Sequence, residues 1–176
     1  MNYWEDKFTF SKERTLEYFS AVRSGKAEAM QNTNTEIEVL DPENVSTTNL
    51  DKNALELVKN NPDINFYIFF PPYSILYFVD LYEKDINLFK AEFKLKEELM
   101  CNMVEYDNAK VFDFQHLDSI THNLDNYKDL SHFSSSTNKF IIDSLKVGEV
   151  ELNQDSCTST LGIIKEQVES FDFSKI

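Results

Sequence analysis

The chain has 176 residues, a length that suits one globular domain with a buried core. Lys plus Arg number 17 and Asp plus Glu number 31, so the net charge is −14, and such an acidic surface repels nucleic acid and anionic membrane surfaces. Aromatic residues at 14% argue against bulk disorder, and a total of only 3 glycines excludes the Gly-rich phosphate loops of Rossmann or Walker type.

Residues 1–48 form an N-terminal region in which the sequence gives few signals of regular structure. Apolar residues recur on one helical face of Ser11–Val22, Ser11 can cap that helix, and Gly25 can end it. The polar stretch that follows, 26–48, predicts a loop with at most a short strand at Ile37–Leu40.

The structural signal sharpens from Asn49. Helical spacing of apolar residues predicts a helix over about 50–60, ended by Pro62. The apolar run Ile64–Phe70 predicts a strand covered on both faces, and the following prolines end it. A short helix over Ser74–Tyr82 and a long amphipathic helix over Asp85–Tyr106 come next.

The last third of the chain repeats the order of strand, loop and helix. Ala109–Phe114 predicts a second strand, and 115–135 a polar loop. A helix through Phe140 closes at Gly148, and residues 154–176 form a tail with one more helix near Leu161–Ser170. Strands that alternate with helices indicate an α/β fold with a parallel sheet, but two strands alone make a poor unit, so the sheet is expected to be incomplete.

The chain has only two cysteines, Cys101 and Cys157, so a disulfide framework or a zinc site is not indicated. The apolar helical pattern around Cys101 favours a buried free thiol, with one disulfide as the alternative. The start of the chain has no pattern of a secretory signal, and the longest apolar run, Ile64–Phe78, is too short and too interrupted to span a bilayer.

Ligands of parallel sheets bind beyond the carboxyl ends of the strands, where Pro71–Ser74 and 125–134 fall. Asp129 and His132 are three residues apart, so the carboxylate can hold one imidazole nitrogen while the other faces a substrate. An oriented histidine of this kind activates a hydroxyl nucleophile. The alternative is a capping or solvated pair, which this spacing produces often by chance.

The order FFPPYS, long helix, VFDFQ, polar loop and NYKDLSHFS resembles the C-terminal half of the SGNH hydrolase superfamily, and in particular the bacterial envelope proteins similar to DltD. The resemblance covers 49–153. It implies a flavodoxin-like three-layer α/β/α sandwich, incomplete on its N-terminal side, that extends as a single domain over 1–176. It also implies hydrolysis or transfer of acyl esters, often on carbohydrates, without a cofactor, in proteins commonly placed at the cell envelope. Asp129 and His132 match the Asp-x-x-His motif of such proteins.

The chain departs from this family at the nucleophile. The family's serine lies in a Gly-Asp-Ser-like or Gly-Ser-Ser-like turn after the first strand, whereas Gly25, Gly148 and Gly162 lie in no such turn. The glycine and asparagine motifs of the oxyanion hole have no match either. The chain therefore resembles the C-terminal part of such a protein, and we expect it to be inactive alone.

Three further residues complete the predicted site. Ser74 is the best local candidate for a nucleophile, and its alternative role is to cap the helix that follows. Tyr73 and Tyr127 are candidates to line a sugar site, with core packing as the alternative. No metal is expected.

We expect no metal site because the spacing of His116 and His122, with Asp113 and Asp118, matches no usual ligand pattern.

Two alternatives to an ester-processing protein stay open: a non-catalytic remnant that binds a partner or itself, and an α/β binding module without SGNH ancestry. Missing strands would leave an apolar sheet edge around Ile64–Phe70, so we expect a homo-oligomer or aggregation through that edge.

Overall fold

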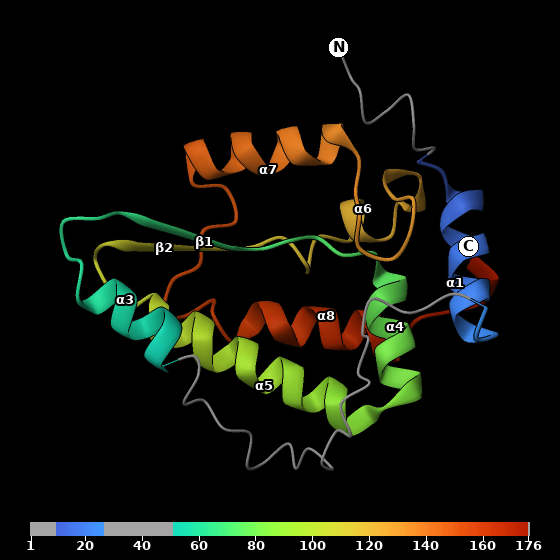
Figure 1. Ribbon diagram of the computed structural model, residues 1–176, viewed down its shortest axis with the longest axis horizontal. Helices are drawn as coiled ribbons and strands as arrows, with labels where there is room; N and C mark the ends of the chain where they lie inside the picture. Colours follow the sequence, from blue (N-terminus) through green and yellow to red (C-terminus); the bar gives the residue numbers. More distant parts are fainter. Residues whose placement is uncertain (1–9, 27–50, 176) are drawn as a thin grey trace.

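The computed structural model describes residues 10–26 and 51–175 of the chain. They form a mixed α/β structure that is mostly helical and has a two-stranded parallel sheet. Figure 1 shows this sheet with α7 along one face and α5 and α8 along the other. The predicted strand at Ile37–Leu40 and most of the N-terminal region 1–48 lie outside the described residues.

The described residues form the helices α1 (Lys12–Arg23), α3 (Glu56–Lys59, after a π-helical turn η1 at Asp51–Leu55), α4 (Ile75–Lys84), α5 (Ile86–Met103), α6 (Asp118–Thr121), α7 (Ser135–Val147) and α8 (Ser159–Glu169), with short 3-10 turns η2 (Leu124–Asn126) and η3 (Phe173–Lys175). The longer helices form where the sequence predicts them, although α4 ends two residues later and α5 three residues earlier than expected. Ser11 caps α1 by accepting from Arg14 N, as predicted, and Gly148 ends α7 at a φ of 75°, which favours glycine. The predicted polar loop 115–135 contains α6 and η2.

The two predicted strands are confirmed as β1 (Phe66–Phe70) and β2 (Ala109–Asp113), and they pair in parallel with Phe66 opposite Ala109. The other edge of β2 is bridged by an antiparallel segment at Glu151, where Leu152 N donates to Val111 O at 2.7 Å. The β1 edge has no described neighbour.

The expectation that Ile64–Phe70 is covered on both faces is wrong for β1. Its side chains alternate, so that Phe66, Ile68 and Phe70 pack partly buried against the main core on the side of α5 and α8. Tyr67 and Phe69 point to the opposite face and are 53% and 43% exposed. The reason is that α7 packs over Phe112 and Phe114 of β2 and its extension, and reaches β1 only in part.

The expectation of a free thiol at Cys101 is also wrong. Cys101 on α5 forms a disulfide with Cys157, just before α8, with the two Cα atoms 5.3 Å apart. This bond ties α5 to the segment that leads into α8, and both helices lie along the same face of the sheet (Figure 1). None of the helices that the structure describes is both long and apolar enough to cross a membrane.

Candidate functional site

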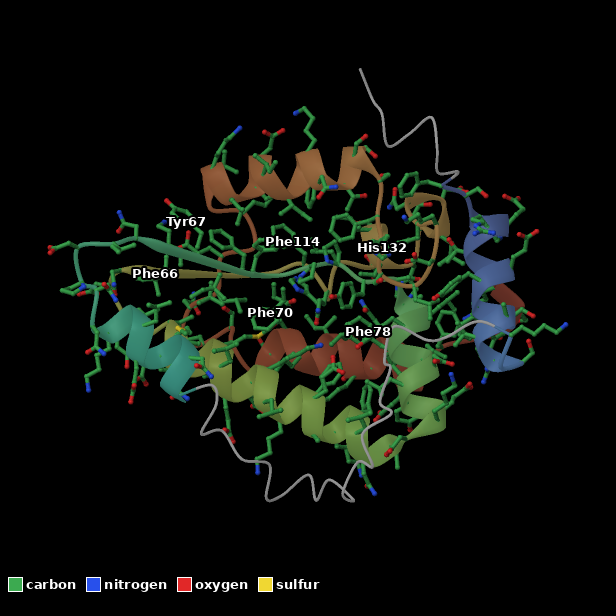
Figure 2. The ribbon with its side chains drawn as sticks, in the orientation of Figure 1. Phe66, Tyr67, Phe70, Phe78, Phe114 and His132 are labelled. Atoms are coloured by element: carbon green, nitrogen blue, oxygen red, sulfur yellow. A yellow bond between two sulfur atoms is a disulfide. The ribbon has the colours of Figure 1, made fainter. Side chains whose placement is uncertain are left out.

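The candidate site forms where both strands end and the loop after β2 returns to them. The backbone N–H of Ser74, after β1, donates to Leu130 O at 3.0 Å, which fastens the two predicted segments to each other. The returning loop makes a narrow turn, closed by a bridge between Tyr127 and Phe133 and by a 3.2 Å bond from Lys128 N to His132 O. Asp129 and His132 lie inside this turn. Figure 2 shows His132 near the ends of the two strands, at the carboxyl edge of the sheet as expected.

Asp129 organises the turn and the imidazole together. Its Oδ1 accepts from the backbone N–H groups of Ser131 and His132, at 3.0 and 2.8 Å, as short polar side chains do in tight turns. Its Oδ2 lies 2.7 Å from Nδ1 of His132. Main-chain donors thus fix one oxygen of the carboxylate while the other contacts the ring. A carboxylate held in this way can fix the orientation of the imidazole.

This contact assigns the tautomer of the neutral His132 side chain. An ionised carboxylate can only accept a hydrogen bond, so Nδ1 is the nitrogen that has the proton, and Nε2 keeps a lone pair. The His132 side chain is 55% exposed while that of Asp129 is 15% exposed, so the pair is open on the imidazole side only. No hydrogen bond from residues 10–26 or 51–175 occupies Nε2.

An apolar hollow of about 330 Å³ lies beside this imidazole. It is lined by Phe69, Pro71, Tyr73, Ser131, His132 and Phe133. The end of β1 and the turn after β2 supply one wall each. A ligand in this hollow would meet aromatic surface and one lone-pair nitrogen, which suits the apolar part of an ester or the face of a sugar ring.

Of the other three predicted site residues, one lines the hollow and two are buried. Tyr73 lines the hollow, whereas Tyr127 is fully buried and donates its hydroxyl hydrogen to Pro72 O at 2.7 Å. Burial raises the pKa of Tyr127 far above the usual tyrosine value. Ser74 is buried, and its Oγ accepts from Leu76 N at 3.3 Å, so the capping role is confirmed. The nucleophile role of Ser74 stays a prediction that would require the first turn of α4 to open.

A second Asp-x-x-His pair begins at Asp113, the last residue of β2. Asp113 is fully buried, its Oδ1 accepts from Gln115 N at 2.9 Å, and its Oδ2 lies 3.2 Å from Nδ1 of His116. Gln115 then joins Pro71 O to Lys96 Nζ, at 3.2 and 3.0 Å. The sequences DFQH and DLSH share the Asp-x-x-His spacing, so this second pair can be found in the sequence. Spacing alone does not show that Asp113 and His116 contact each other.

His122 lies apart from both pairs, in a separate hollow that it shares with Asp118 and the end of α8. Burial lowers the pKa of His122, and the nearby Asp118 opposes part of that effect. Among the residues that the structure describes, no three His, Cys, Asp or Glu side chains come together as a metal site would require.

Comparisons of the chain with protein-family models, with curated proteins and with solved structures find no match. The resemblance to SGNH hydrolases therefore depends on the residues quoted from the sequence. What it implies for this chain is a proposal.

Proposed function

We propose that the chain is the carboxyl-terminal part of an SGNH-type, flavodoxin-like α/β/α domain that processes acyl esters on cell-envelope glycans. In this proposal His132 is the general base and Asp129 is the carboxylate that orients it. The observation that supports it most directly is the 2.7 Å contact between Asp129 Oδ2 and His132 Nδ1, with Nε2 open beside an apolar hollow.

The proposed chemistry is proton transfer at Nε2 of His132. A hydroxyl nucleophile would give its proton to Nε2 as it attacks the ester carbonyl, and the imidazolium so formed would be stabilised by Asp129. The same proton would then pass to the leaving oxygen. Neither step needs a cofactor.

No hydroxyl of the described residues donates to Nε2, and Ser74 is buried in its capping role. We therefore infer that residues 10–26 and 51–175 supply the base and part of the substrate surface but no nucleophile. The expected consequence is binding of esters or glycans without turnover, because a base without a nucleophile loses several orders of magnitude in rate.

A non-catalytic role is the second candidate, and the half-exposed Tyr67 and Phe69 on β1 favour it. An exposed apolar sheet face of this kind often marks an interaction site. Both candidate functions are consistent with the structure of the sheet. They predict different roles for His132, because only the ester-processing function uses its imidazole.

The test is a titration of the full chain with a short-chain acyl ester and with an O-acetylated oligosaccharide, followed by histidine NMR signals and by release of acid. We expect His132 signals to shift with ligand, His122 signals to stay, and no acid to form. Isothermal titration calorimetry gives a binding readout that does not need the imidazole itself. His132→Ala should remove the heat of binding, while His122→Ala, a matched change in another hollow, should keep it.

Three results would alter this conclusion. Turnover abolished by both His132→Ala and Ser74→Ala would make Ser74 the nucleophile. Turnover abolished by His132→Ala alone would indicate another hydroxyl of this chain. Turnover or binding that survives His132→Ala, or no ligand response at all, would overturn the proposed site.

A further inference from the structure

The outer edge of β1 presents unpaired backbone groups. Phe66 N donates to Asn108 O, and Phe70 O accepts from Phe114 N, so the even-numbered residues of β1 bond to β2. In a parallel ladder alternate residues face each neighbour, and the N–H and C=O groups of Tyr67 and Phe69 therefore point away from β2. No residue of the described chain bonds to them.

From this edge we propose that the chain forms a two-fold dimer in which β1 pairs antiparallel with β1 of a second copy, centred on Ile68. The proposal does not depend on the proposed function, because the pairing uses the β1 backbone and neither Asp129 nor His132. Phe69 is the one residue of β1 that also lines the hollow beside His132. It joins two sheets of two strands into one sheet of four.

The sequence of β1 fits its own reverse. About a two-fold axis at Ile68, Phe66 lies opposite Phe70 of the second copy, and Tyr67 lies opposite Phe69. Ile68 meets itself. Every cross-strand pair is thus aromatic with aromatic or aliphatic with aliphatic, which are the pairings that stabilise antiparallel strands.

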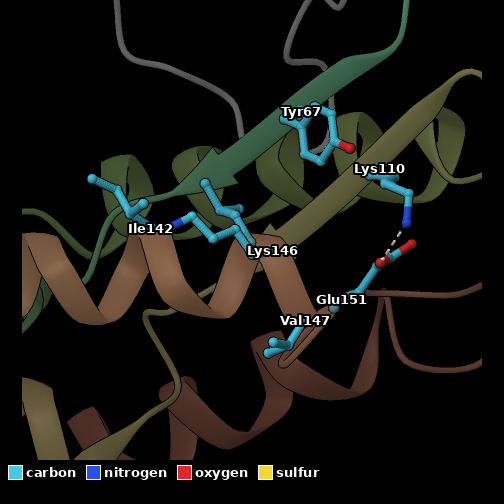
Figure 3. Close-up of a pocket in the computed structure, with 8 residues that line it drawn as sticks. Tyr67, Lys110, Ile142, Lys146, Val147 and Glu151 are labelled. Atoms are coloured by element: carbon cyan, nitrogen blue, oxygen red, sulfur yellow. Dashed lines mark hydrogen bonds and ion pairs between the residues drawn. The ribbon is translucent and has the colours of Figure 1, made fainter.

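The charges around the edge permit this contact in a chain with a net charge of −14. The run Ile64–Phe70 has no charged residue. Lys110, beside Tyr67, is already paired with Glu151 at 3.1 Å, and Lys146 on α7 with Asp143 at 3.3 Å. Figure 3 shows the first of these pairs in a hollow of about 430 Å³ between the sheet and α7, with Tyr67 at its rim.

The geometry also limits the assembly to two copies. Pro71 ends the new ladder because it has no N–H and its C=O already accepts from Tyr73 N and Gln115 Nε2. The far edge of β2 is occupied by the segment at Glu151. Once the two β1 edges pair, no open strand edge is left in the described sheet, and growth stops.

The first test is sedimentation velocity of the full chain over a range of concentrations. We expect a monomer–dimer equilibrium, and we expect Phe69→Lys to raise the dimer Kd by about tenfold or more, because a charge would enter both Tyr67–Phe69 pairs of the interface. The matched control is Ile163→Lys on α8, since Ile163 is 44% exposed and Phe69 43%. It should leave the Kd unchanged, and thermal melts should confirm that both variants are folded.

The second test fixes the register by mild oxidation. Ile68→Cys should yield a disulfide-linked dimer, because facing residues on the axis have Cα atoms about 4.5–5.5 Å apart, within disulfide range. Tyr67→Cys should not link to itself, since it faces Phe69 of the other copy. The proposal is overturned by a monomer at all concentrations, by open-ended aggregates in place of a dimer, by a dimer that Phe69→Lys leaves intact, or by equal linking of both cysteine variants.

Discussion

The disulfide between Cys101 and Cys157 gives the most quantitative prediction. It closes a loop with a sequence separation of 56 that contains β2, α6 and α7. Loop closure on this scale removes conformational entropy from the unfolded chain worth about 4 kcal/mol at 25 °C. For a chain of this length that corresponds to a fall in Tm of roughly 10 °C when the bond is reduced.

The assay compares thermal unfolding of the wild-type chain with and without reductant. The Cys101→Ala/Cys157→Ala double variant serves as the matched control. Reductant should lower the Tm of the wild type toward that of the double variant and should leave the double variant unchanged. Alkylation of both thiols in denatured, unreduced protein would refute the bond itself. An intact bond whose reduction leaves Tm unchanged would refute the loop-entropy reasoning.

Three further predictions concern single side chains. Asn108→Ala should cost about 2 kcal/mol in urea unfolding, because Asn108 Nδ2 lies within 3.1 Å of the Val58, Asn61 and Ile64 carbonyl oxygens and those acceptors would lose their donor. Because burial raises the pKa of Tyr127, the folded state holds its proton where the unfolded state loses it, so stability should fall above about pH 10, and less so in Tyr127→Phe. Because burial lowers the pKa of His122, the unfolded state takes up a proton first, so stability should fall below about pH 6.5, and His122→Gln should flatten that dependence in acid titrations; an unchanged slope would contradict it.

Local signals predicted the two strands and several helix ends. The cap at Ser11, the break at Pro71 and the left-handed turn at Gly148 are set by a few neighbouring residues, and each is where the sequence indicates. The pairing of Cys101 with Cys157 could not be derived in this way, because it depends on how α5 and α8 pack on one face of the sheet.

The sequence spacing predicted which residues of the site contact each other, but it did not predict which of them are buried. Asp129 and His132 contact each other because three residues of a turn bring them together, a local property. Tyr127 precedes them by only a few residues, yet its ring is buried and its hydroxyl bonds to Pro72, which is distant in sequence. The half-exposed face of β1 was likewise hidden, since an apolar run does not show which of its faces a helix covers.

The central claim is that Asp129 holds His132 with Nε2 free to accept a proton. Long-range ¹⁵N–¹H NMR of the neutral imidazole, at pH 8.5, measures this directly. We expect the Nδ1–H tautomer for His132 and, in Asp129→Asn, a shift toward the tautomer mixture of an unconstrained histidine. A proton on Nε2 of His132, or a tautomer that Asp129→Asn leaves unchanged, would contradict it.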